Sequence, residues 1–216
     1  MGGVQITAMD SLKEAAAEGE GAARAAVEGC GYARTRFVGL ETPVWAGLSM
    51  EGRLSDVVLF DNEAARGRGP LAEAFQQMVA DEQRPTIVAR EGLKADGVVA
   101  VAWDGGKEAS RAARTALPLL EKASRVVILA APQASSRNFD ADRLRQFFVE
   151  RGVNAEVKLI NDNGDAAQLL LDGARDVSAD VLVAGAFGHP RLQEYIFGGT
   201  TRTLLNNDGP SLFLSH

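Results

Sequence analysis

The 216-residue sequence is poor in the residues that build disulfide frameworks and metal centres, because it contains one cysteine, Cys30, and two histidines. A single cysteine cannot form an internal disulfide. The histidines, His189 and His216, are not part of a Cys/His cluster with metal-ligand spacing. The sequence therefore predicts no metal site and is typical of a protein of the reducing cytoplasm.

The sequence also lacks an excess of positive charge and long hydrophobic runs. Its net charge is -6 and its pI is about 5.1, whereas proteins that grip a nucleic-acid backbone present clustered lysine and arginine. The longest apolar runs, such as 98–103 and 126–132, are far shorter than the roughly 20 residues of a membrane-spanning helix. No basic and apolar signal pattern opens the chain. We therefore expect no nucleic-acid partner, no membrane partner and a cytoplasmic location.

The second half of the sequence alternates strand-like and helix-like patterns. The apolar run 97–103 ends at Asp104, a helical pattern with a kink at Pro118 follows, and a second buried strand covers 125–131. Asp140 and Asp165 are candidate caps of two further helices. Strands at 154–160, 181–184 and 211–215 and a helix near 201–206 complete the pattern. This alternation predicts an α/β fold: an open parallel sheet with helices on both faces, as in Rossmann-like proteins.

The first half repeats the later part of this pattern. Residues 55–60 are similar to 179–184, and residues 84–88 are similar to 209–213, which indicates a duplication. Ahead of them, Ser11 and Glu14 form a candidate capping box for an alanine-rich helix ending near 29–31, and 35–45 has a strand-like pattern. The opening strand, helix and strand have no counterpart. We therefore expect an incomplete unit at 1–92 and a complete domain at 97–216, joined at 92–96.

Glycines are concentrated after the strand at 181–184, where Gly185, Gly188, Gly198 and Gly199 precede Thr200. Glycine lets the backbone approach a ligand closely, and the N–H groups at a helix start favour phosphate oxygens. Ligands of open α/β sheets bind outside the carboxyl ends of the strands, and Asp104 also follows such an end. The two segments are therefore predicted to face one pocket.

The spacing G-x2-G-x9-G, with an Asp-Gly turn after the first strand, resembles the universal stress protein family over about residues 98–216. The resemblance implies the adenine nucleotide alpha hydrolase-like fold and ATP as ligand, with or without magnesium. In ATP-binding members, the aspartate after the first strand and a main-chain position at the end of the second strand hold the nucleoside, while the glycine motif surrounds the phosphates. The nucleoside residues implied here are Ala102, Trp103, Asp104 and Ala131. The phosphate residues implied here are Gly185, Gly188, Gly198, Gly199 and Thr200.

One position departs from the family pattern. Gly199 stands where the family has serine or threonine, so that Thr200 would have to supply the hydroxyl group. The corresponding loop of the first half, 61–70, starts with an acidic residue and lacks the G-x2-G spacing. We therefore expect at most one nucleotide per chain.

The sequence is compatible with two alternative functions from different classes. In the first, the protein is a stress-response regulator whose loop is ordered by ATP. In the second, it is an interaction module with an empty site that acts through dimerisation. The sequence has no Walker lysine, serine elbow or carboxylate pair beside the glycine loop. We assign no catalytic residue and expect at most slow ATP hydrolysis; a transferase is supported by fold analogy alone.

Purely structural interpretations stay open for the same residues. Gly185 and Gly188 are compatible with a tight turn alone, Asp104 with a helix cap, and Trp103 with core packing. The last strand, 212–215, could pair with its equivalent in the first half or with another subunit. We expect a homodimer, because the unfinished first unit would expose an apolar sheet.

Overall fold

The computed structural model describes residues 17, 19–130, 140–160, 164–186 and 199–216, and it divides the chain into Met1–Thr42 and Pro43–His216. In the first part, residues 19–29 are helical, as expected, while the candidate capping box at Ser11 and Glu14 lies outside the described residues. Arg24 lies over the ring of Phe37, with its guanidinium carbon 4.5 Å from the ring centroid.

The strand expected at 35–45 is wrong. Residues 35–43 have no regular structure, and a helix, α2 (Val44–Gly52), begins after Pro43. Proline has no N–H to donate to a neighbouring strand, and its fixed φ suits the start of a helix. The alternating residues ahead of it therefore have a strand-like pattern without forming a sheet.

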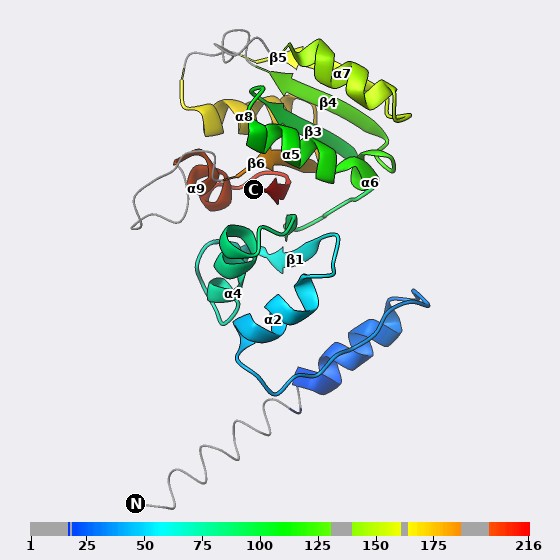
Figure 1. The fold of residues 1–216 in the computed structure, drawn as a ribbon, viewed down its shortest axis with the longest axis vertical. Helices are drawn as coiled ribbons and strands as arrows, with labels where there is room; N and C mark the ends of the chain where they lie inside the picture. The colour runs from blue at the N-terminus through cyan, green and yellow to red at the C-terminus, as the bar shows by residue number, and fades with distance from the viewer. Residues whose placement is uncertain (1–16, 18, 131–139, 161–163, 187–198) are drawn as a thin grey trace, which may run out of the picture. The chain divides into compact units, whose positions relative to one another are not determined.

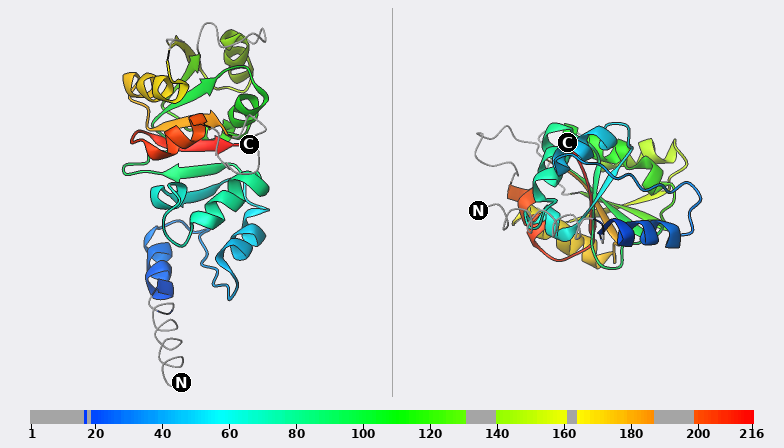
Figure 2. Two further views of the ribbon diagram at one scale, coloured as in Figure 1. Left: turned by 90° about the vertical axis from the view of Figure 1, so that its left-hand side faces the viewer. Right: turned by 90° about the horizontal axis from the view of Figure 1, so that it is seen from below.

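The second part is built on a seven-stranded open sheet in the order β1-β2-β7-β6-β3-β4-β5 (Figures 1 and 2). Neighbouring strands are parallel, except that β2 and β7 are antiparallel. The strands are β1 (Val58–Asp61), β2 (Thr86–Ala89), β3 (Val98–Trp103), β4 (Arg125–Ala130), β5 (Ala155–Leu159), β6 (Val181–Gly185) and β7 (Ser211–Ser215). The sequence prediction of a mainly parallel open sheet is confirmed.

Helices cover both faces of this sheet (Figure 2). One face carries α5, α6 and α7, and the other carries α8, α9 and, from the first half of the sequence, α2, α3, α4 and the π-helix η1. The bounds are α3 (Asn62–Ala65), α4 (Ala72–Gln76), the π-helix η1 (Gln77–Asp81), α5 (Lys107–Thr115), α6 (Leu117–Leu120), α7 (Ala141–Val149), α8 (Ala166–Asp176) and α9 (Gly199–Asn206).

Local sequence signals account for several of these boundaries. The Asp140 carboxylate accepts a hydrogen bond from Asp142 N at 3.0 Å, and the Asp165 carboxylate accepts one from Gln168 N at 2.9 Å. Both aspartates are therefore helix caps, as predicted. Pro118 lies in the first turn of α6, so the helical pattern from Lys107 is broken between α5 and α6.

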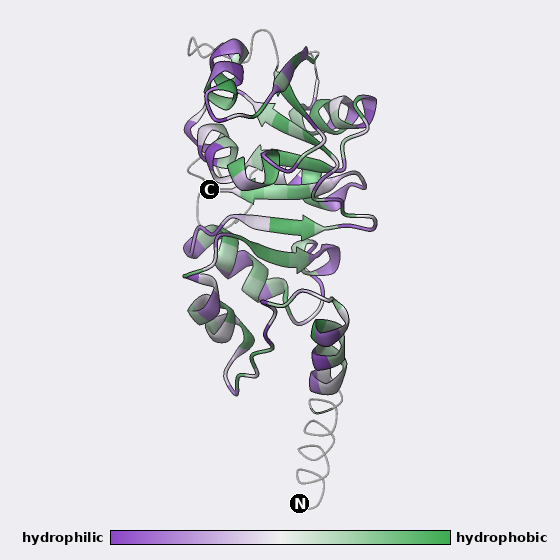
Figure 3. Cartoon of the chain, turned by 90° about the vertical axis from the view of Figure 1, so that its right-hand side faces the viewer, coloured by the Kyte–Doolittle hydropathy of each residue, from purple (hydrophilic) through white to green (hydrophobic). Residues whose placement is uncertain are grey.

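Two hydrophobic cores hold the layers together, one on each face of the sheet, and Figure 3 shows the hydrophobic residues concentrated along the strands. In the first, the rings of Phe60 and Phe75 pack edge to face with centroids 5.4 Å apart. In the second, Phe148 of α7 is fully buried. The strands β3, β6 and β7 are largely buried on both faces, as is typical of the central strands of an open sheet that helices cover on both sides.

The last strand, β7, has a hydrogen-bonded neighbour on each side. Its partner on one side is β6, and on the other side it pairs with β2, with Thr86 opposite Leu214 and Val88 opposite Leu212. Of the two partners that the sequence left open for this strand, the structure therefore places the one from the first half of the same chain. As a result, β7 offers no free edge to another subunit.

Candidate functional site

The candidate site lies at the carboxyl edge of the sheet, where β3, β6 and β7 end side by side. The register pairs Val101 with Val183, and it pairs Gly185 with Ser215. Parallel strands bring their carboxyl ends to one edge, so the segment after Trp103 and the segment after Ala184 start from the same edge. The structure thus gives both segments one starting edge, while the single pocket predicted for the two motifs stays a prediction.

Asp104 forms a tight turn between β3 and α5. Its carboxylate accepts a hydrogen bond from Gly106 N at 2.7 Å, and Gly105 has a φ of +73°, a conformation that favours glycine. The N-cap position of α5 is Gly106 and not Asp104. Asp104 is exposed, and Ala102 and Trp103 are half-buried, so Asp104 keeps surface that a ligand could contact while it stabilises the turn.

Trp103 packs against the second hydrophobic core, on the face that α5 and α7 cover. Part of its surface remains accessible. The structural interpretation, core packing at a strand end, therefore accounts for part of this side chain. Stacking on a nucleoside would have to use the remaining surface.

Gly185 is packed against the first turn of α5. A Cβ atom at this position would lie 2.6 Å from the Glu108 carbonyl carbon and 2.7 Å from Ala109 N. Main-chain atoms cannot move aside as the end of a flexible side chain can. A glycine is therefore required here by helix–strand packing, whether or not a ligand binds.

Gly199 and Thr200 form the beginning of α9, and both are exposed. A Cβ atom at Gly199 would meet no atom within 4 Å. Because α9 connects the carboxyl end of β6 to the start of the parallel strand β7, its N-terminus faces the carboxyl edge of the sheet. The first N–H groups of a helix have no acceptor within the helix and favour an anion.

Three of the residues proposed from the sequence, Ala131, Gly188 and Gly198, lie outside the described residues. The residues whose positions the structure gives are therefore Ala102, Trp103, Asp104, Gly185, Gly199 and Thr200. They come from β3, β6 and α9 and the turn that follows β3.

His216 follows β7 at the same edge, and sequence reasoning gave it no role. Partial burial lowers the pKa of its imidazole, the positive charges of Arg111 and Lys107 lower it further, and Glu108 opposes the shift. All three charged residues belong to α5. The parallel order of the last two strands is the signal that could have placed His216 here.

The corresponding turn of the first half has a structural use. The Asp61 carboxylate accepts a hydrogen bond from Ala64 N at 2.7 Å and so caps α3. Arg68 forms an ion pair with Glu63 at 2.7 Å, and Gly67 and Gly69 both have positive φ values. This loop is therefore organised around a short helix and a turn.

Within the residues that the structure describes, no group of three or more His, Cys, Asp or Glu side chains could hold a metal ion. Among the same residues, none of the helices is long and apolar enough to cross a membrane.

Comparison with known proteins gives a consistent set of similarities. Residues 97–207, just over half of the chain, match the model of the universal stress protein family. A universal stress protein from Archaeoglobus fulgidus DSM 4304 has a TM-score of 0.61 at 15% identity, over 79% of this chain and 64% of that chain. The chain therefore corresponds to less than two thirds of that protein.

Two further solved structures are similar. A functionally unknown protein from Pseudomonas aeruginosa PAO1 has a TM-score of 0.53 at 16% identity, over 96% of this chain and 77% of that chain. A universal stress protein in complex with cAMP has a TM-score of 0.42 at 19% identity, over 57% of this chain and 99% of that chain. No curated protein sequence matches.

Proposed function

Because the chain belongs to the universal stress protein family, we propose that it binds ATP, with or without magnesium, at the carboxyl edge of β3 and β6. The observation that carries this proposal is the convergence on one sheet edge of the Asp104 turn, the Gly185 strand end and the N-terminus of α9. A nucleotide needs an apolar and polar surface for its nucleoside and N–H donors for its phosphates. These segments offer both.

Separate residues would hold the two parts of the nucleotide. Ala102, Trp103, Asp104 and Ala131 would contact the nucleoside. Gly185, Gly188, Gly198, Gly199 and Thr200 would surround the phosphates. Gly199 has no hydroxyl group, so Thr200, the second residue of α9, would be the only hydroxyl donor at this position of the motif.

Binding, rather than catalysis, would be the function. We propose a cytoplasmic regulator of the stress response in which ATP orders the segment between Gly185 and Gly199 and so changes a surface that partners contact. We assign no catalytic residue. Hydrolysis would be slow at most, since it requires a positioned water molecule and a phosphate-bound metal ion for which we identify no dedicated side chain.

Calorimetric titration of ATP with magnesium into the full chain tests this proposal. We expect close to one nucleotide per chain, and we expect loss of binding in Gly188→Glu, which adds a negative charge to the phosphate motif. The matched control is Gly21→Glu, an exposed helical position where a Cβ would meet no atom within 4 Å. Absence of heat from the wild-type protein, after removal of any bound nucleotide by extraction, would contradict the proposal.

A second candidate function is an interaction module with an empty site. Gly199 favours it, because the hydroxyl that the family pattern places there is missing. The glycine at 185 does not argue against it, because packing on α5 requires this residue in any case. Protein partners without measurable nucleotide binding would support this second function.

We also propose that the chain is a tandem protein, with an incomplete unit at 1–92 before the complete domain at 97–216. The parallel pairs β1–β2 and β6–β7 support this, since in each pair a strand from one repeated segment lies beside the strand from the next repeated segment. In the complete domain, β6 is flanked by β3 and α5 packs over β6 and β7. The strand β1 has no such neighbour and is the edge of the described sheet.

A homodimer formed through the β1 edge would cover this strand. Leu59 and Val57 are 60% and 40% exposed there, and Val58 N donates to Pro85 O on the β2 side, so the main-chain groups of Leu59 point to the open edge. Sedimentation equilibrium should give a dimer for the wild type and a monomer for Leu59→Lys. Leu54→Lys, at a 98% exposed position before the strand, should remain dimeric. A monomeric wild type would rule the dimer out.

A further inference from the structure

Arg90 follows β2 and connects the first half of the sequence to the end of α9. Its Nη2 donates to Leu204 O at 2.7 Å and its Nη1 donates to Pro210 O at 2.9 Å. Its Nε donates to Asn62 Oδ1 at 3.3 Å, and its main-chain N donates to the Ser211 hydroxyl at 3.0 Å. The guanidinium is therefore held at α3 and bonded to the chain on both sides of the turn after α9.

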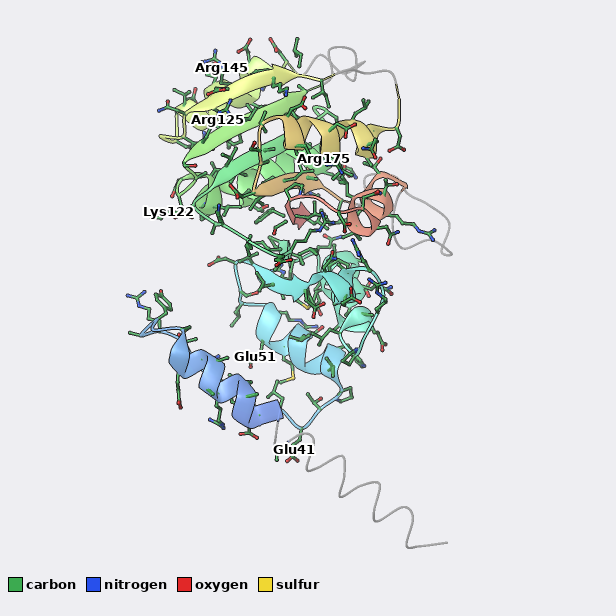
Figure 4. The ribbon with its side chains drawn as sticks, turned by 180° about the vertical axis from the view of Figure 1, so that it is seen from behind. Glu41, Glu51, Lys122, Arg125, Arg145 and Arg175 are labelled. Atoms are coloured by element: carbon green, nitrogen blue, oxygen red, sulfur yellow. The ribbon has the colours of Figure 1, made fainter. Side chains whose placement is uncertain are left out.

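Arg66 adds a second connection from the first half. Its Nε donates to Leu205 O at 3.3 Å, and its Nη2 forms an ion pair with Asp208 Oδ1 at 2.7 Å. From the complete domain, Arg175 near the end of α8 donates to Asp208 O at 3.2 Å; Figure 4 labels this residue. Side chains from α8, from the turn after α3 and from the turn after β2 thus meet at one end of α9.

These bonds go to groups that a helix leaves unpaired at its C-terminus. The last four carbonyl groups of a helix accept no hydrogen bond from an N–H group of the same helix. Here Thr203 O accepts from Asn207 N, while Leu204 O and Leu205 O accept from Arg90 and Arg66. Positive charge at this end also complements the helix dipole. Two carbonyl groups of the last turn of α9 are therefore satisfied by the first half of the sequence.

Arg90 pays a desolvation penalty in this position. Partial burial lowers the pKa of its guanidinium, the neighbouring charge of Arg66 lowers it further, and Asp208 acts in the opposite direction. An arginine whose guanidinium faced only solvent would experience neither this burial nor these neighbouring charges. Hydrogen bonds from a charged donor to carbonyl groups are stronger than neutral ones and offset the penalty.

We infer that Arg90, supported by Arg66, is a positioning residue for the nucleotide site: the first half of the sequence fixes the C-terminal end of α9, whose N-terminal end carries Gly199 and Thr200. The helix has eight residues, or about 12 Å at 1.5 Å per residue. If the C-terminal end of α9 were no longer fixed, the helix could tilt, and the N–H groups at its N-terminal end would move away from the phosphates. This inference rests on the proposed nucleotide binding. It gives the incomplete unit a function, to position α9, although that unit is expected to bind no nucleotide itself.

Arg90→Lys tests the inference in the full chain. Lysine keeps the positive charge but lacks the planar fork that reaches Leu204 O and Pro210 O together. We expect the Kd for ATP with magnesium to rise about threefold to tenfold, and amide hydrogen exchange to accelerate in residues 201–206. The matched control is Arg53→Lys, which alters the bidentate pair of Arg53 with Glu82 in the same half of the sequence. It should change neither measurement.

Each result decides a separate point. An unchanged Kd in Arg90→Lys, measured well below its unfolding temperature, would overturn the positioning role. Exchange that accelerates equally in β3 and β6 would also overturn it, because the variant would then have lost general stability. If Arg90→Lys unfolds, Arg66→Lys replaces it with the same expectations. If the wild type binds no ATP, the proposed function fails with the positioning role, while acceleration confined to α9 would still uphold the mechanical connection.

Discussion

Replacing Gly185 with alanine should destabilise the protein, although alanine is the smallest side chain that can be added. The new Cβ would lie 2.6 Å from the Glu108 carbonyl carbon, 2.7 Å from Ala109 N and 2.8 Å from Glu108 Cβ. Ordinary contacts of this kind are about a full ångström longer. Relief therefore requires α5 to move away from the end of β6, which disturbs two buried elements.

The magnitude follows from the cost of overpacking a buried site, which is typically about 1–3 kcal/mol. For a body of this size, each kcal/mol lowers the Tm by roughly 2–4 °C. The variant should therefore unfold about 2–12 °C below the wild type, without any nucleotide present. Circular dichroism during thermal unfolding, together with urea unfolding, measures the change.

Gly199→Ala is the matched control within the same motif. Its Cβ would meet no atom within 4 Å, so its free energy of unfolding should change by no more than about 0.5 kcal/mol. Wild-type stability in Gly185→Ala would refute the conclusion that packing on α5 requires this glycine. Equal destabilisation by both substitutions would refute it as well.

Three further predictions concern the site and its frame. Gly199→Ser should bind ATP several-fold more tightly by calorimetry, because a hydroxyl bond to phosphate contributes about 1 kcal/mol, and affinity no better than that of Gly199→Ala would contradict this. Asp165→Ala should lose about 1 kcal/mol in urea unfolding through loss of the cap to Gln168 N, and an unchanged midpoint would refute the cap. Burial lowers the pKa of His216 below its ordinary 6.5, so that the unfolded chain binds a proton that the folded chain does not. Stability should therefore fall as the pH drops below 6.5, less so in His216→Gln, and identical pH profiles would contradict the assignment.

Much of the structure of residues 97–216 could be predicted from the sequence, because the sequence signals there are local. The caps Asp140 and Asp165 and the break at Pro118 each act within a few residues. The expected strand at 97–103 is β3 at 98–103, and the expected strand at 154–160 is β5 at 155–159. Hydrophobic runs and turn residues are sufficient to place such elements.

Features that depend on distant contacts could not be predicted. The prediction of a strand at 35–45 was wrong because an alternating pattern does not by itself supply a neighbouring strand for hydrogen bonding. A helix begins after Pro43 instead. The bond from Arg90 to Leu204 O joins residues 114 positions apart, and no local pattern marks either one. The close packing of Gly185 on α5 could not be predicted either, because the sequence shows that a glycine motif is present but not which helix lies beside it.

The most direct test of the nucleotide site is amide hydrogen exchange of the full chain with and without saturating ATP and magnesium. We predict slower exchange in three described segments, Asp104–Gly106, Gly185–Ala186 and Gly199–Thr201, and unchanged exchange in the corresponding loop of the first half, residues 61–70. Unchanged exchange at all three segments, or slower exchange at 61–70 alone, would contradict the assignment of the site.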